Sequence, residues 1–594
     1  MCGIFGCVGK ISEEKAWECI KRIEHRGPDA LQVKQLPQAT LAHARLAIID
    51  TTEAANQPFS DETERYWIVF NGEIYNYIEL RKELQSVGYS FRTKSDTEVL
   101  LKAYIHWGEE AQNKCNGMWA AAIWDAKERK LFLSRDRFGI KPLYYYEDEN
   151  GFYFGSEMKS FFPVMKQRNI NYRLFDKNYD YFSFENGKDC TIQGIQKLLP
   201  GNCAILLEGK LHVKKWWETL DHLIDVPERY EEQVELFREL FLDACKIRMR
   251  SDVPLGTALS GGVDSSTVIG AMSYLGKEND VQRDWQHAFV ASMPYSIIDE
   301  TAYAKKAAEH IAISLTEVPI HAHITPEEMM NDIYMCEDPI ATIPRVFLQT
   351  YKAIKNSGVS VSLDGHGADE LFGGYVFDLF YYGREVIGEK DKLSRLYKIY
   401  NETCMSESRL TEDEFFRRAS KSPRIGVGVQ SHNIDAFNKI LYEETHQKTL
   451  PTLLRNYDRY SMANSVEIRM PFMDYRIVSF AFSIPAASKL QNDYLKAIVR
   501  DMAMPFMSKE VLYRKLKLGF NSPLTEWFHG ELKEFLVDTV SSKEFYECEL
   551  INPLLAKMYI QDFYMNDRRD YSAGEKVWTT IAPYLWKKAV IDCG

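Results

Sequence analysis

The chain has 594 residues, of which 45% are hydrophobic and 27% are charged. This balance indicates a globular protein of at least two domains and excludes a disordered or fibrous one. The formal net charge of −12 is spread along the chain without a basic run, so we do not expect it to bind nucleic acid.

The eleven cysteines form neither CxxC pairs nor the regular spacing of a secreted disulfide framework, which favours a reducing compartment. The first twenty residues carry acidic groups and lack the apolar core of a signal peptide. No stretch approaches the ~20 apolar residues that a membrane span needs. We therefore expect a cytoplasmic protein that does not contact a membrane.

Over the first two hundred residues, short β-rich runs alternate with turn residues. The runs lie at 67–70, 118–124, 131–134, 142–146 and 152–154. Asn-Gly between apolar runs signals a hairpin, which applies to Asn71-Gly72 and to Asn150-Gly151. Helices expected over 77–88 and 95–108 would pack against the resulting sheets.

The strand pattern stops between Trp216 and Arg229, where a long amphipathic helix begins. Its apolar positions recur at helical spacing, at Val234, Phe237, Leu240, Phe241, Ala244 and Ile247. We therefore predict two domains, residues 1–218 and 226–594.

In the second domain, short apolar runs at 255–259, 288–293 and 359–364 are each followed by a loop and a helical pattern. Alternating strands and helices predict a doubly wound parallel sheet, so the fold class is α/β. The polar, helical segment 377–450 is expected to form an excursion over the surface of this domain.

The chain begins Met1-Cys2-Gly3. Once Met1 is removed, the Cys2 thiol and a free α-amine share one residue, and the amine can accept the thiol proton near neutral pH. For Cys2 alone, a small buried residue is an equally good interpretation. Four further motifs favour catalysis: HRGPD from His25, HARLAIID from His43, FNGEIYN from Phe70 and SDTE from Ser95.

With MCGIFG at the start, these motifs resemble in order and spacing the glutaminase domain of class II glutamine amidotransferases. The resemblance implies a sandwich of antiparallel sheets flanked by helices, the N-terminal nucleophile hydrolase type. It also implies that Arg45 holds the glutamine α-carboxylate, Glu73 and Asp96 its ammonium, and Asn71 with the Gly72 amide the oxyanion. These residue types suit those charges.

The segment LGTALSGGVDSS, residues 255–266, places a Gly-rich turn between a strand and a helix. Freed backbone amides and serine hydroxyls at a helix N-terminus can cradle a pyrophosphate. SGGVDSS resembles the pyrophosphate loop of ATP pyrophosphatases, which implies ATP as substrate. We expect the ATP site to contain Leu259, Ser260, Gly261, Gly262, Asp264, Ser265, Ser266, Ala291, Asp364 and Gly365.

A second Gly-rich loop, LDGHGADELFGGY, follows the strand-like run at 359–364. Asp264 and Asp369 would suit Mg²⁺, which takes few protein carboxylates and adds phosphate oxygens. Asp369 could instead cap a helix. Both loops follow strand ends, where open α/β sheets bind ligands.

Residues 459–474 and 513–523 resemble the C-terminal signatures of glutamine-hydrolysing asparagine synthetases, and the likeness runs through both domains. It implies that Lys517 stabilises the adenylating transition state, with Lys515 as a rival. Glu467 and Arg469 also match family positions, although a structural ion pair would explain them equally well. The family further implies an apolar tunnel for ammonia and suggests a homodimer.

The sequence departs from the family at His366, where the usual residue is a glutamate that takes a proton from ammonia. A neutral imidazole can do the same work. The run from Asp338 to Phe347 also differs from the usual acceptor-binding text. The leading hypothesis is an asparagine synthetase, and the alternative amidates another carboxylate, such as a sugar uronic acid or a natural-product acid. Lactam-forming relatives and an inactive scaffold rank lower because Cys2 and SGGVDSS are intact.

Overall fold

The computed structural model describes residues 2–175, 181, 184–277, 281–405, 409–429, 434–519 and 521–592. Its N-terminal part contains two six-stranded antiparallel sheets, ordered β10-β8-β9-β1-β3-β2 and β12-β11-β7-β6-β5-β4. The strands are β1 Gly3–Gly9, β2 Ala30–Leu36, β3 Ala39–Arg45, β4 Phe59–Ser60, β5 Tyr66–Ile74, β6 Gly117–Asp125, β7 Lys130–Arg135, β8 Tyr144–Asp148, β9 Gly151–Gly155, β10 Gln196–Lys197, β11 Asn202–Leu207 and β12 Lys210–Lys215.

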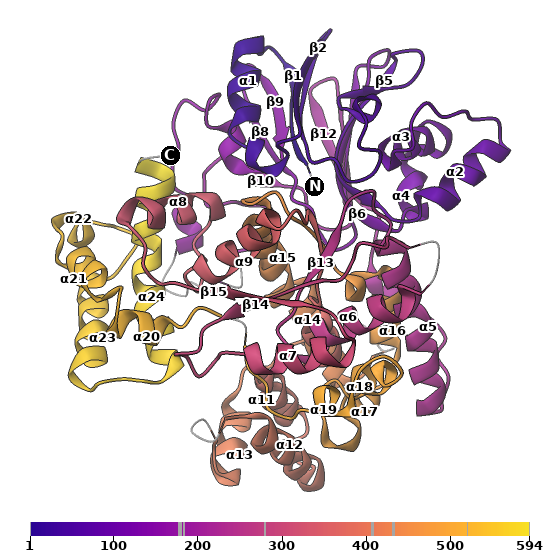
Figure 1. Ribbon diagram of the computed structural model, residues 1–594. Helices are drawn as coiled ribbons and strands as arrows, with labels where there is room; N and C mark the ends of the chain where they lie inside the picture. The colour runs from indigo at the N-terminus through magenta and orange to yellow at the C-terminus, as the bar shows by residue number, and fades with distance from the viewer. Residues whose placement is uncertain are drawn as a thin grey trace.

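The two sheets stack face to face through alternating apolar residues, with Ile4 and Leu41 of one sheet in a core with Val69 and Leu133 of the other. Helices cover the outer faces: α1 packs on the first sheet, and α2 and α3 pack near the second (Figure 1). They are α1 Glu13–Lys21, α2 Tyr77–Ser86, α3 Asp96–Trp107 and the short α4 Ala111–Lys114. The predicted sandwich is confirmed.

One of the two predicted turns is wrong. Asn150-Gly151 does join a hairpin, because Asp148 of β8 pairs with Gly151 of β9. Asn71 and Gly72 instead lie inside β5, paired with Ala120 and Trp119 of β6. A Cβ on Gly72 would lie 2.1 Å from the Met118 carbonyl oxygen, so the glycine permits close strand contact there instead of a turn.

The C-terminal part is built on a five-stranded parallel sheet of order β15-β14-β13-β16-β17. Its strands are β13 Leu255–Ala258, β14 His287–Ser292, β15 Leu315–Pro319, β16 Val361–Leu363 and β17 Glu467–Arg469. The chain leaves β13 in one direction toward β15 and returns on the other side through β16, so β13 and β16 flank a topological switch point. The doubly wound sheet is confirmed, although the sequence did not indicate β15 or β17.

Helices surround this sheet and extend from it. Those before β16 are α5 Tyr230–Arg248, α6 Val263–Leu275, α7 Thr301–His310, α8 Pro326–Cys336 and α9 Arg345–Asn356. Between β16 and β17 are α10 Ala368–Phe372, α11 Val376–Glu385, α12 Lys390–Thr403, α13 Glu412–Lys421, α14 Ala436–His446 and α15 Thr449–Met462. Helices α11 to α14 form the predicted excursion, of which residues 406–408 and 430–433 lie outside the described part.

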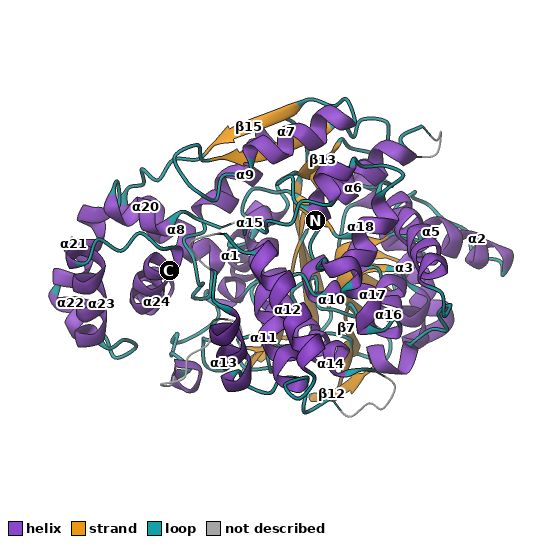
Figure 2. Cartoon of the chain, turned by 90° about the horizontal axis from the view of Figure 1, so that it is seen from below, coloured by secondary structure: helices purple, strands orange, loops and turns teal. Residues whose placement is uncertain are grey.

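The chain ends in a further set of helices. They are α16 Tyr475–Ser483, α17 Ala486–Lys489, α18 Ala497–Ala503, α19 Lys509–Leu512, α20 Leu524–His529, α21 Lys533–Ser541, α22 Lys543–Tyr546, α23 Pro553–Met565 and α24 Tyr571–Trp586. Figure 2 shows α20 to α24 gathered at one side of the molecule. None of the helices in the described ranges is long and apolar enough to cross a membrane.

Candidate active sites

Cys2 immediately precedes β1 and is buried, with 8% of its surface exposed. Its backbone nitrogen donates to Asn71 Oδ1 at 3.1 Å, and Arg26 Nε donates to its carbonyl oxygen at 3.0 Å. Burial raises the pKa of the thiol, and the positive charge of Arg45 opposes that rise. The residue is thus held at both ends of its backbone, with its thiol in a desolvated site.

Asn71 is fully buried on β5, and its Nδ2 has no hydrogen-bond partner among the described residues. An unpaired buried amide is costly, so the group is suited to a ligand atom beside Cys2. The motif histidine His43 is not available as a base, because its Nε2 donates to the Phe70 carbonyl oxygen at 3.2 Å and burial lowers its pKa to about 3.

Glu73 and Asp96 are both buried, and the charge of Asp96 adds to the rise in the pKa of Glu73. Burial raises the pKa of both, that of Asp96 to about 6. Asp96 Oδ2 accepts from the Ile74 amide at 2.9 Å, and Glu73 lies 3.5 Å from Arg469 Nη2. Buried carboxylates whose negative charge is only partly balanced by the protein favour a cationic group on the ligand.

Arg45, at the end of β3, is buried and oriented by the chain that follows it. Its Nη1 donates to the Thr52 carbonyl and to Asn56 Oδ1, both at 2.7 Å, and Nη2 donates to the Asp50 carbonyl. Its guanidinium is therefore fixed in place while its charge acts on the Cys2 thiol. Of the predicted glutamine-site residues, Asn71 on β5 thus contacts Cys2 and Arg45 on β3 acts on its thiol. Glu73 lies two residues after Asn71 on β5, and Asp96 bonds the Ile74 amide of the same strand.

The second site is a cavity of about 760 Å³ at the carboxyl ends of β13, β14 and β16. The loop after β13 is preorganised, because Gly262 N donates to Ser260 Oγ at 3.1 Å and Ser260 N donates to Ser265 Oγ at 3.2 Å. The predicted residues that line the cavity are Leu259, Ser260, Gly262, Asp264, Ser265, Ala291, Asp364, Gly365, His366, Asp369 and Lys517. Gly261 and Ser266 lie in the loop and in α6 without lining it.

The loops after β13 and β16 approach each other closely. A Cβ on Gly365 would lie 2.8 Å from Asp264 Cβ, so only a glycine fits. Asp364 holds the two strands together: its carboxylate accepts from the Ala258 amide, the Ser362 hydroxyl and Tyr351 Oη at 2.6–3.2 Å.

Asp264 and Asp369 converge on one cation. Lys496 Nζ lies 2.7 Å from an oxygen of each, and Lys517 Nζ lies 2.8 Å from Asp369. The two lysines hold the pKa of Asp369 well below its usual range. Lys515, the rival to Lys517, pairs instead with Glu402. The two carboxylates therefore fit a Mg²⁺ that is completed by phosphate oxygens, although no group of three metal-ligating side chains occurs among the described residues.

His366 lies on the wall of this cavity, with its ring 3.7 Å from that of Tyr457 on α15. Burial lowers the pKa of His366, so the imidazole is neutral near pH 7. Its Nδ1 has no hydrogen-bond partner in the described part of the chain and lies 4.0 Å from Asp364 Oδ2. The loop from Ile340 to Thr342 lines the same region. A neutral imidazole on the wall of a cavity can accept a proton.

A buried cluster of charges joins the two parts of the chain. Arg26 pairs with Glu157 at 2.7 Å and, through both terminal nitrogens, with Asp458 of α15 at 2.8 and 3.1 Å. The cluster is completed by Lys141, Lys159, Glu337 and Arg459, with every side chain at most 3% exposed. Because Arg26 also binds the Cys2 carbonyl and Tyr457 packs on His366, α15 lies between the two sites.

Sequence reasoning gave no role to Lys496, Asp458 or Tyr457, and it cited Arg26 only as part of the HRGPD motif. Lys496 lies in no motif that singles out a lysine, and the Arg26–Asp458 pair joins residues 432 positions apart. Glu467 and Arg469 form an ion pair at 2.6 Å, as one of the two interpretations of these residues expects. Arg469 also lies near Glu73.

The first site presents a nucleophile with groups for an amino acid, and the second presents a phosphate-binding loop with paired carboxylates. Together they define a glutamine amidotransferase joined to a nucleotide-binding synthetase. A model described as a glutamine amidotransferase domain matches residues 1–217, and one described as asparagine synthase matches residues 236–588.

Known proteins resemble the whole chain. "Asparagine synthetase (glutamine-hydrolyzing) 1" of Bacillus subtilis (strain 168) is 31% identical, covering 100% of this chain and 97% of that protein. "Asparagine synthetase (glutamine-hydrolyzing) 3" of the same organism is 28% identical, covering 89% of this chain and 88% of that protein. "Amidase chry2" of Gibberella zeae is 25% identical, covering 87% and 86%. The chain belongs to the family of glutamine-hydrolysing asparagine synthetases, and is thus an ATP-dependent carbon–nitrogen ligase.

Proposed function

We propose that the protein hydrolyses glutamine at Cys2 and uses the ammonia to amidate a carboxylic acid that ATP has activated as an acyl-adenylate. The observation that carries this proposal is the convergence of Asp264 and Asp369, from two strand-end loops, on one cation position beside Lys517. We assign glutamine hydrolysis to residues 1–218 and synthesis to residues 226–594.

At the first site, the Cys2 thiolate attacks the glutamine amide carbon, and the freed α-amine takes the thiol proton. Asn71 Nδ2 and the Gly72 amide would stabilise the oxyanion. Ammonia leaves, and water hydrolyses the thioester to glutamate. Arg45 would pair with the glutamine carboxylate, and Glu73 with Asp96 would pair with its ammonium, in keeping with their charges and burial.

At the second site, an acceptor carboxylate oxygen attacks the α-phosphorus of ATP and pyrophosphate leaves. Asp264 and Asp369 would hold Mg²⁺, which supplies positive charge to the phosphates. Lys517 would neutralise charge that develops in the transition state, a role for which its contact with Asp369 favours it over Lys515. Ammonia then attacks the acyl carbon, AMP leaves, and His366 accepts the surplus proton.

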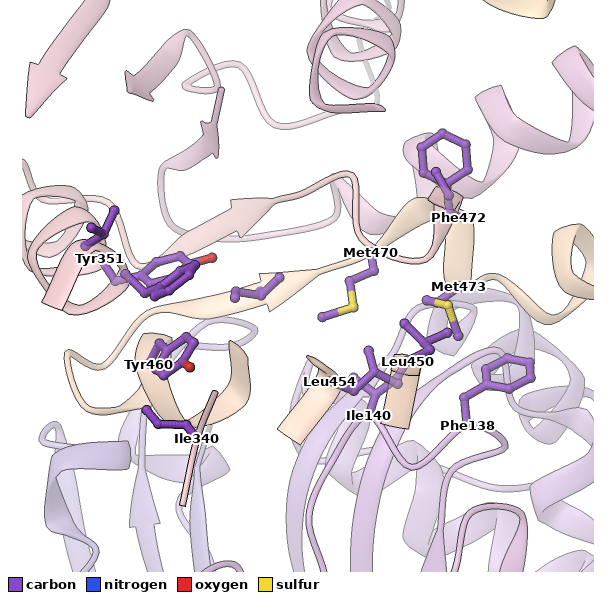
Figure 3. Close-up of a cluster of buried hydrophobic side chains, with 14 of the residues drawn as sticks. Phe138, Ile140, Ile340, Tyr351, Leu450, Leu454, Tyr460, Met470, Phe472 and Met473 are labelled. Atoms are coloured by element: carbon purple, nitrogen blue, oxygen red, sulfur yellow. The ribbon is translucent and has the colours of Figure 1, made fainter. Parts of the chain in front are cut away.

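Ammonia would pass between the sites through apolar surroundings, where it stays unprotonated. Figure 3 supports this route: Phe138 and Ile140, from the N-terminal part, lie beside Leu450, Leu454 and Met473. The same cluster includes residues that line the synthetase cavity, among them Ile340 and Tyr460.

The proposal also concerns which carboxylic acid is amidated and therefore which product is formed. Asparagine, formed from aspartate, is the leading product because of the family. Another carboxylate, such as a uronic acid, is the second candidate, favoured by His366 in place of the usual glutamate. An amidase is also among the relatives of this chain. A cytosolic setting is supported by the ten described cysteines, which are all unpaired. A homodimer stays a suggestion of the family likeness.

Pyrophosphate release tests the proposal. The wild-type chain should release pyrophosphate with ATP and one acid of a panel containing aspartate and uronic acids, given either glutamine or ammonia. Cys2→Ala should abolish the glutamine-dependent product and leave the ammonia-dependent product. Loss of both products would refute the division into two sites, and failure to release pyrophosphate with any acid of the panel would refute the acyl-adenylate.

A further inference from the structure

Helix α24, near the end of the chain, supports one wall of the synthetase cavity. Trp578 Nε1 donates to the Ile340 carbonyl at 2.8 Å, and Trp586 Nε1 donates to the Glu337 carbonyl at 2.7 Å. Both indole side chains are buried. The helix therefore fixes the backbone of the loop whose next residues, up to Thr342, line the cavity.

Glu575 lies on the same face of α24, because it precedes Trp578 by three residues. It is half-buried, lines the cavity, and has its pKa raised by burial alone. No charged or hydrogen-bonding group among the described residues partners its carboxylate.

Other carboxylates of the cavity differ from Glu575 in this respect. Asp264 and Asp369 bind lysines, Glu300 binds Arg514 at 3.0 Å, and Glu370 accepts from Tyr375 Oη. Glu575 is thus a carboxylate that lines the cavity without a hydrogen-bonding or charged partner among the residues that the structure describes. A partly desolvated, unpaired carboxylate is costly unless a ligand supplies the partner.

Thr342 adds a second unsatisfied group on the same wall. Its hydroxyl is buried and has no partner in the described ranges. This wall belongs to the acceptor end of the cavity, since Ile340 lies near Tyr460 in Figure 3 and Tyr457, one turn earlier on α15, packs on His366. The phosphate-binding loop after β13 forms a different part of the cavity.

We propose that Glu575, beside the loop from Ile340 to Thr342, contacts the acceptor acid and selects acids that donate hydrogen bonds, through an ammonium or through hydroxyl groups. This inference rests on the proposed amidation. An ionised carboxylate forms charge-assisted bonds with such donors. An acid without a donor would leave Glu575 unpaired, and a site with an unpaired polar group discriminates strongly against that ligand.

The test uses the full-length chain with ammonia as nitrogen source and pyrophosphate release as readout. Aspartate and succinate differ only by the ammonium, and glucuronate and cyclohexanecarboxylate differ in their hydroxyl groups and ring oxygen. The variants are Glu575→Gln and Glu575→Ala. The control is Glu534→Gln on α21, an exposed carboxylate outside the cavity.

If the acceptor donates through an ammonium, both Glu575 variants should raise the acceptor KM about 10- to 100-fold and reduce the preference for aspartate over succinate. If it donates through hydroxyl groups, Glu575→Ala should raise the KM for glucuronate, whereas Glu575→Gln, which keeps an accepting oxygen, should stay within about threefold. The KM for ATP and glutamine hydrolysis should not change in either case.

The two proposals fail differently. The proposed function is overturned if the wild-type protein does not release pyrophosphate with any of the acids offered. Wild-type protein that uses an acid, while both Glu575 variants keep the acceptor KM of the control, overturns the assignment of Glu575. Equal increases in the KM for the acceptor and in the KM for ATP would also overturn it, because they indicate a structural role.

Discussion

Removing the Asn71 side chain should disable glutamine hydrolysis while sparing synthesis from ammonia. Asn71 is fully buried, and its Nδ2 has no partner in the described structure, so no bond within the protein competes for the oxyanion. Loss of one such donor from a desolvated site raises the barrier by about 3–4 kcal/mol, or a factor of about 10²–10³ in kcat. We therefore expect Asn71→Ala to lower kcat for glutamate formation by that factor.

The assay compares glutamate formation with ammonia-dependent pyrophosphate release in the same preparation. The KM for glutamine should change little, because the oxyanion exists only beyond the ground state. Asn113→Ala, on the exposed end of α4, is the matched control and should behave as wild type. A kcat within threefold of wild type, or an equal loss of ammonia-dependent activity, would refute the reasoning.

Two further predictions follow from buried charges. Burial raises the pKa of Asp96 to about 6, so the carboxylate is mostly ionised above that pH and mostly protonated below it. We therefore expect kcat/KM for glutamine to fall as the pH drops through about 6. An inflection near that pH that persists in Asp96→Asn would contradict this assignment. Asp458→Ala leaves Arg26 without its two-point partner in a fully buried site, and should cost about 3–5 kcal/mol of stability in chemical denaturation. Lys543→Gln, in an exposed pair, should cost nothing measurable, and equal effects would contradict the role of burial.

The fold class could be predicted because strand and helix patterns are local properties of the sequence. The exceptions have physical reasons: β17 has only three residues, and β15 is largely exposed and lacks a continuous apolar run. The Asn71-Gly72 pair failed as a turn signal because tertiary contact with β6, where a glycine is needed, overrides local preference.

The candidate sites were predictable where each motif is contiguous, as in SGGVDSS or at Cys2. Lys496 was not, because its position depends on how the chain after β17 returns to Asp264, 232 residues earlier. Glu575 carried no signal either, since its significance depends on where the fold places it and on its having no partner among the described residues.

The charge cluster around Arg26 has a practical consequence for anyone who wishes to recombine parts of this enzyme. Arg26, Lys141 and Lys159 come from one half, and Asp458 and Glu337 from the other, in a region that water does not reach. A glutaminase grafted onto a foreign synthetase would bring three cations with only Glu157 of its own half as a counterion. Successful chimeras must transplant both sides of the cluster together, and natural variants that change one side should show a matching change on the other.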